Sequence, residues 1–121
     1  MKKQLTQTLT VSANQTAESL GSGLLPVFST PSLVAFMENT AMQLIELPAG
    51  GSSVGTSIAV KHLKASRVGE MLTCIATITE SEGRRFAFEL KVTDSTGETV
   101  GEGVHERFVV DVERFMSKLN K

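Results

Sequence analysis

The feature that most constrains the fold is one long helix pattern followed only by strand patterns. The tripeptide Ser29-Thr30-Pro31 is a strong helix start, because Thr30 can cap free N–H groups and Pro31 suits the first helical position. Apolar residues then recur at helical spacing until the Gly-rich segment that begins at Pro48. The pattern predicts a helix over 30–47. Its apolar positions are Leu33, Val34, Met37, Ala41, Leu44 and Ile45.

Four runs of alternating apolar residues follow this helix, as expected for half-buried β-strands. Turn residues separate the runs at 66–69, 81–83 and 94–97. Such short connections favour antiparallel hairpins. The residues that share one face in the successive runs are Val54, Thr56, Ile58, Val60 and His62; Leu72, Cys74, Ala76 and Ile78; Phe86, Phe88, Leu90 and Val92; and Val100, Val104, Phe108 and Val110.

The two ends of the chain complete the predicted architecture. Loose alternation at 4–12 predicts one more strand, 14–26 reads mainly as loop, and helical spacing at 111–119 predicts a short amphipathic helix. The order predicts an α+β fold, with the long helix packed on a five-stranded antiparallel sheet. We expect residues 1–121 to form a single domain, because this length suits one core. The second sheet face needs protection, which favours a homodimer.

Composition excludes several classes of protein. Twelve Lys and Arg against 13 Asp and Glu give a net charge of -1, so no basic excess supports nucleic-acid binding. The single cysteine, Cys74, rules out an intramolecular disulfide and a Cys-based zinc site, and it reads as a buried apolar residue. No apolar run approaches the roughly 20 residues of a membrane helix. The expected location is therefore the cytoplasm, away from a membrane.

Glu38 and His62 are the strongest candidates for chemistry. Glu38 follows Val34 by four residues and falls inside the apolar stripe, where a carboxylate is costly unless it is paired or functional. His62 shares a strand face with Ile58 and Val60. Each has a plain structural reading, as a stripe-edge glutamate and a strand-end histidine. If both face the helix–sheet seam, they can polarise a water molecule.

Other motifs carry less weight. Thr30 is explained as a helix cap, although a hydroxyl at a helix start can also contact an oxyanion; it lies about 12 Å from Glu38 along the helix axis. Residues 51–55 match G-x-S-x-G, but the helix precedes Ser53 instead of following it, which argues against a nucleophile elbow. The histidines show no recognised metal-binding spacing, so no metal is expected.

Several segments together resemble the fluoroacetyl-CoA thioesterase family. Residues 27–38 resemble its helix region, Gly55 to His62 its strand with the catalytic histidine, and residues 101–108 its characteristic last strand. The likeness covers about residues 26–115. It implies the hot-dog fold, in which a long helix is wrapped by an antiparallel sheet, and a working dimer.

The resemblance also implies an activity and a set of site residues. The family hydrolyses acyl-CoA thioesters without a metal, and coenzyme A enters only as part of the substrate. Thr30, Glu38 and His62 match its catalytic threonine, glutamate and histidine. Its substrate contacts are expected at Val34, Gly55 and Arg107.

The chain departs from the family pattern in two places. Residues 12–26 form a short Gly- and Ser-rich segment instead of a longer lid, and Asn39 stands where an aromatic residue is expected. These departures favour a general small or medium acyl-CoA substrate.

Three alternatives stay open at this point. The same fold can bind an acyl-CoA or another apolar ligand without turning it over. It can also hydrate an enoyl thioester and leave the C–S bond intact, or serve as a purely structural dimer. The assembly can be a homodimer or a tetramer.

Overall fold

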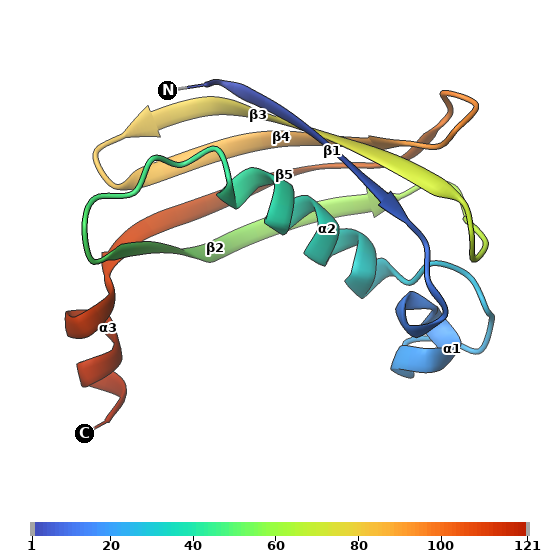
Figure 1. The fold of residues 1–121 in the computed structure, drawn as a ribbon, viewed down its shortest axis with the longest axis horizontal. Coiled ribbons are helices and arrows are strands. Elements are labelled where there is room, and N and C mark those ends of the chain that lie inside the picture. The colour runs from blue at the N-terminus through green and yellow to red at the C-terminus, as the bar shows by residue number, and fades with distance from the viewer. Residues whose placement is uncertain (1, 121) are drawn as a thin grey trace.

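The computed structural model describes residues 2–120, and its main elements follow the predicted order of strand, long helix and four strands (Figure 1). The segment predicted as loop contains a 3-10 turn and a short helix, which Thr16 caps by accepting a hydrogen bond from Ser19 N. The elements are β1 (Gln4–Thr10), a 3-10 turn (Ala13–Gln15), α1 (Ala17–Leu20), α2 (Thr30–Met42), β2 (Gly51–His62), β3 (Met71–Glu82), β4 (Arg85–Thr93), β5 (Thr99–Asp111) and α3 (Val112–Leu119).

The sheet is antiparallel with strand order β1-β3-β4-β5-β2. The predicted hairpins form between β3 and β4 and between β4 and β5, but the one between β2 and β3 was wrong. Instead, β2 pairs with β5, in a register from Gly51 opposite Asp111 to His62 opposite Gly101. The linker after β2 runs from the β2 edge of the sheet across to the region of β1 and β3. At its first end Leu63 N donates to Val100 O, and at its last end Glu70 O accepts from Val11 N.

Helix α2 begins and ends differently from the prediction. Ser29, not Thr30, is the cap, since its hydroxyl accepts a hydrogen bond from Ser32 N at 3.1 Å. The helix ends at Met42 instead of 47, where Leu44 N bonds to Ala41 O in a tighter turn. Capping by Ser29 leaves the Thr30 hydroxyl available for another partner.

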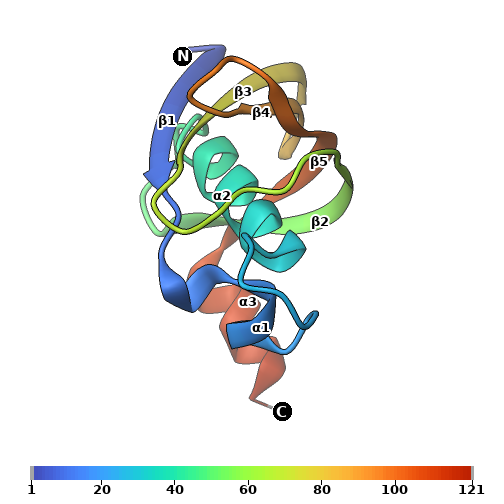
Figure 2. The same cartoon turned by 90° about the vertical axis from the view of Figure 1, so that its right-hand side faces the viewer.

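The core lies between α2 and the sheet, which curls around the helix (Figure 2). Leu33 and Met37 of α2 are fully buried, and so is Cys74, as predicted. Gly101 allows this close packing, because a Cβ there would lie 2.7 Å from Leu33 Cδ2. Other core residues include Phe28, Phe36, Ala41, Leu72, Ala76, Phe88, Leu90 and Val92.

Strand β5 turns a polar face toward the helix. The predicted apolar set lies on the other side of the sheet, where Val104 is 55% and Phe108 is 42% exposed. A register shift between β4 and β5 leaves Val100 as an extra residue and places it in the core. The inner face therefore carries His105 and Arg107, which are both buried.

Two features of the chain lack a partner within the described residues. Strand β2 pairs only with β5, so its other edge is open over twelve residues. Helix α3, the predicted amphipathic helix, extends beyond this side of the sheet (Figure 1). Its exposed apolar residues are Val112, Phe115, Met116 and Leu119. Among residues 2–120, no helix is long and apolar enough to cross a membrane.

Candidate active site

Thr30 and His62 form the first part of the candidate site. His62 is the last residue of β2, and its ring lies at the start of α2. Its Nδ1 is 2.9 Å from Thr30 Oγ1, and the Phe28 ring meets the imidazole edge-on at 6.5 Å. The plain interpretation of Thr30 as a cap was therefore wrong, because Ser29 caps the helix and the threonine hydroxyl contacts the histidine.

The second nitrogen of His62 is buried beside a cavity. Within residues 2–120, His62 Nε2 is buried and has no hydrogen-bond partner. Burial lowers the pKa of His62, and the Lys64 backbone raises it in part, so the ring is neutral near pH 7. A cavity of about 330 Å³ lies here, lined by Thr30 and His62 among others. A neutral imidazole beside a hydroxyl and a cavity can accept or deliver a proton.

Glu38 belongs to a separate cluster. Its side chain is 37% exposed at the edge of α2, and Oε2 lies 4.0 Å from His105 Nε2. Within residues 2–120 of one chain, the cavity beside His62 is not lined by Glu38, so the predicted dry crevice shared by the two residues is not formed there. Two helical turns separate Thr30 from Glu38, and the strand that carries His62 passes Glu38 at Gly55, seven residues earlier.

Gly55 allows the Glu38 carboxylate to approach the backbone of β2 closely. A Cβ built on Gly55 would lie 2.9 Å from Glu38 Oε2, 3.2 Å from His105 Cε1 and 3.5 Å from Arg107 Nη1. Three polar side chains therefore surround one methyl-sized position. The absence of a side chain at Gly55 thus lets the Glu38 carboxylate lie close to the backbone of β2.

Arg107 lies beside Gly55 and is only 7% exposed. Its Nε donates to Ser53 Oγ at 2.8 Å and its Nη2 donates to Ser53 O at 2.9 Å. Burial lowers the pKa of Arg107 and the Glu38 carboxylate raises it, but a guanidinium stays charged at any working pH. Ser53 thus holds a buried cation, and we assign it no nucleophilic role.

The structure thus divides the predicted residues between two groups. We call Thr30 and His62 the hydroxyl–imidazole pair, and Glu38, Gly55, His105 and Arg107 the carboxylate cluster. Val34 is half-buried on α2, one turn before Glu38. His105 was missed by sequence reasoning as a site residue, although its alternation with Arg107 on one strand face was a usable signal.

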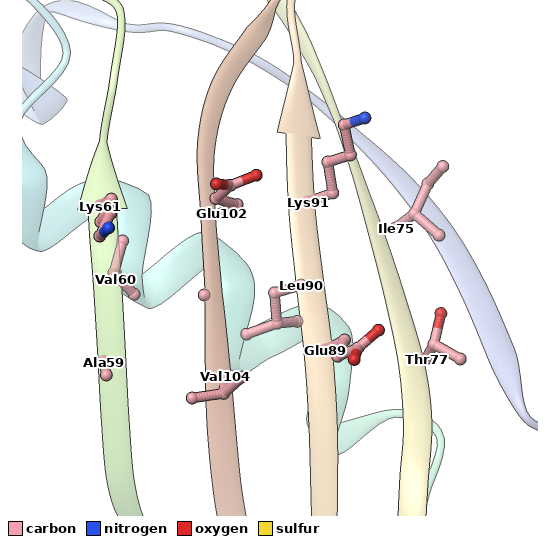
Figure 3. A pocket seen from close by; sticks show the side chains of 11 residues that line it. Ala59, Val60, Lys61, Ile75, Thr77, Glu89, Leu90, Lys91, Glu102 and Val104 are labelled. Atoms are coloured by element: carbon pink, nitrogen blue, oxygen red, sulfur yellow. The ribbon is translucent and has the colours of Figure 1, made fainter.

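A larger cavity lies elsewhere, on the sheet face away from α2 (Figure 3). It has a volume of about 690 Å³, and Glu102 stands in register between Lys61 and Lys91. Val104 and Leu90 are among its apolar lining residues. None of the predicted catalytic residues lines this cavity, so we place the candidate site on the helix side.

The two histidines predict how stability depends on pH. Burial lowers the pKa of both His62 and His105 below the usual 6.5. The unfolded chain therefore binds protons more strongly, and the free energy of unfolding should fall as pH drops below about 6.5. The limit is about 1.4 kcal/mol per pH unit for each proton. Urea denaturation between pH 8 and pH 5 measures this slope, and constant stability from pH 7 to pH 5 would contradict it.

A family model and a curated relative both match this chain over most of its length. The family model for the fluoroacetyl-CoA-specific thioesterase matches residues 11–113. The fluoroacetyl-CoA thioesterase of Streptantibioticus cattleyicolor is 34% identical over 97 residues, covering 78% of this chain and 69% of that protein.

Solved structures agree with the sequence comparison. A structure of the fluoroacetyl-CoA thioesterase FlK superposes with a TM-score of 0.93 at 28% identity, covering 99% of this chain and 96% of FlK. A mutant of FlK in complex with fluoroacetate and CoA gives 0.88 at 29% identity, with 95% and 99% coverage. The predicted hot-dog fold is confirmed. The chain belongs to the fluoroacetyl-CoA-specific thioesterase family.

Proposed function

We propose that this protein hydrolyses a small or medium acyl-CoA thioester to a free acid and CoA, with Thr30, Glu38 and His62 as catalytic residues and no metal. The observation that carries the proposal is the 2.9 Å contact between Thr30 Oγ1 and His62 Nδ1, with the other imidazole nitrogen buried and unpaired beside a cavity within the described residues. That FlK is named for a CoA thioester and was solved with CoA supports the substrate class.

The proposed reaction needs a nucleophile and a proton for the leaving group. Glu38 removes a proton from water, whose oxygen adds to the thioester carbon, or the carboxylate itself attacks that carbon and water later hydrolyses the resulting anhydride, which releases the acid and restores Glu38. The C–S bond then breaks, the CoA sulfur leaves with the bonding electrons, and His62 passes to the sulfur the proton that water gave up, so that the imidazole ends neutral again. Thr30 and the N–H groups at the start of α2 position the carbonyl oxygen.

The three remaining site residues serve substrate binding in this proposal. Arg107 supplies positive charge beside Glu38, where negative charge builds up on the reacting carbonyl. Gly55 gives the Glu38 carboxylate room to lie against β2, and Val34 lines the path of the acyl group.

A homodimer would bring the two groups of residues together. The open edge of β2 can pair with the same edge of a second copy around a two-fold axis. If the axis passes near Ile58 and Ala59, antiparallel pairing sets His62 opposite Gly55 of the partner subunit. The hydroxyl–imidazole pair of one subunit then meets the carboxylate cluster of the other. The exposed apolar residues of α3, on the same side of the sheet, give a partner further surface to cover.

The test is a panel of acyl-CoA thioesters assayed with a thiol reagent. Steady release of CoA from at least one short or medium acyl-CoA supports hydrolysis. Tight binding without release identifies a binding module, and addition of water to an enoyl-CoA with the C–S bond intact identifies a hydratase. Either outcome would overturn the proposed function.

Gly55→Ala should lower turnover by about 100-fold with little loss of stability. The backbone of Gly55 does not have a positive φ, so alanine fits it, but the new Cβ would lie 2.9 Å from Glu38 Oε2 and displace the carboxylate. Steady-state kinetics and thermal unfolding measure the two effects. Ser81→Ala, an exposed change on β3 away from both groups of site residues, is the control. Full activity in Gly55→Ala would show that the close approach of Glu38 to β2 is not needed.

A further inference from the structure

His105 is buried and held in one orientation. Only 2% of the residue is exposed, and its ring stacks on Phe88 with the centroids 5.9 Å apart. Nδ1 lies 2.7 Å from Ser57 O. Because a carbonyl oxygen can only accept a hydrogen bond, Nδ1 must carry the hydrogen. The contact therefore fixes the tautomer as well as the position of the ring.

This tautomer makes Nε2 an acceptor. Arg107 Nη1 lies 3.3 Å away and is the donor in this pair. Burial, together with the charge of Arg107, lowers the pKa of His105, so the imidazole is neutral near pH 7 and keeps its lone pair at Nε2. Glu38 Oε2, at 4.0 Å from the same nitrogen, is another acceptor and does not bond to it.

The guanidinium of Arg107 is thereby held by all three of its nitrogens. Nε and Nη2 donate to Ser53, and Nη1 donates to His105. The position above Gly55 lies within 3.5 Å of Nη1 and 2.9 Å of Glu38 Oε2. His105 thus accepts a hydrogen bond from Nη1, the guanidinium nitrogen closest to this position. The placement of Nη1 determines where the positive charge of Arg107 lies relative to the Glu38 carboxylate.

We propose that His105 is a positioning residue for the carboxylate cluster: its neutral imidazole, fixed by Ser57, accepts a hydrogen bond from Arg107 and holds the guanidinium toward the Glu38 carboxylate. The proposal rests on the proposed function, in which Glu38 is the base or the nucleophile. His105 itself touches no reacting atom, and it acts through Arg107.

The tautomer gives a test that does not depend on catalysis. Long-range ¹H–¹⁵N NMR of the full-length protein at pH 7 distinguishes protonated Nδ1 from protonated Nε2. We expect His105 to be neutral with its hydrogen on Nδ1. A hydrogen on Nε2, or a charged ring, would overturn the proposal even if the protein proves to be an active thioesterase.

Two substitutions then separate positioning from packing. In His105→Asn the amide can still donate to Ser57 O, but it is too short to offer Arg107 an acceptor. In His105→Gln the longer amide can place its oxygen near the position of Nε2. We expect kcat for the best acyl-CoA of the panel to fall about 10- to 100-fold in the asparagine variant, with KM within about three-fold of wild type, and to recover most of this loss in the glutamine variant.

Folding is monitored in both variants by thermal unfolding and by the mass of the assembly. Equal losses of kcat in the two folded variants would overturn the proposal, because a purely structural imidazole predicts no rescue by glutamine. Wild-type kcat in His105→Asn would overturn it as well. If the wild-type protein releases no CoA from any thioester, the proposed function fails, and the NMR result still decides the orientation of His105.

Discussion

Glu38→Gln should lower kcat for acyl-CoA hydrolysis by about 10²- to 10⁴-fold, the usual loss when a general base is removed. Glutamine keeps the shape of the side chain beside Gly55 and His105, but its amide can neither take a proton from water nor attack a thioester carbon. Stability should change little, since the carboxylate is 37% exposed and makes no direct hydrogen bond to His105. An assay of CoA release measures the loss of kcat, and thermal unfolding measures the change in stability.

Glu89→Gln provides the matched control for this experiment. Glu89 is an exposed glutamate of β4 that lines the cavity on the opposite face of the sheet. The same chemical change there should leave hydrolysis at the wild-type level. Wild-type turnover in Glu38→Gln would remove the carboxylate cluster from the mechanism.

Mixing two inactive variants should restore activity to about one quarter of the wild-type level. One variant is Glu38→Gln and the other is His62→Ala. If each site combines His62 of one subunit with Glu38 of its partner, a mixed dimer has one site with both changes and one intact site. Random pairing of equal amounts makes about half of the dimers mixed. Since one of the two sites in each mixed dimer is intact, about one quarter of all sites are active. Co-expression with two affinity tags isolates the mixed dimer for kinetic measurement.

Thr30→Ala mixed with His62→Ala is the control for subunit sharing. Thr30 and His62 contact each other within one chain at 2.9 Å, so every site in that mixture keeps at least one defect. No recovery is expected there. A mixed dimer of Glu38→Gln and His62→Ala that forms but stays inactive would show that the site is not shared between subunits.

The elements were predictable because their signals are local. Apolar residues at helical spacing from Leu33 to Ala41 indicated α2, and alternation indicated each strand. The pairing of β2 with β5 was not predictable from turn residues, because it joins segments about fifty residues apart and depends on how the linker crosses the sheet.

The site was only partly predictable for a related reason. Thr30, Glu38 and His62 were predicted from their positions and the family resemblance, and the structure brings Thr30 and His62 into contact. His105 was missed because strand alternation marks apolar residues, and in β5 these face away from the helix. A buried polar face that holds a cation leaves no apolar pattern in the sequence.

The cap at Ser29 has a consequence for altering the chemistry of this protein. Because the Ser29 hydroxyl accepts the hydrogen bond from Ser32 N, the side chain of the neighbouring Thr30 is not needed to cap the helix. Of the two adjacent hydroxyls, Ser29 caps the helix and Thr30 contacts the histidine of the proposed site. The side chain that meets His62 is consequently free to be exchanged, for a thiol or a smaller alcohol, without unravelling the first turn on which the rest of the site is built.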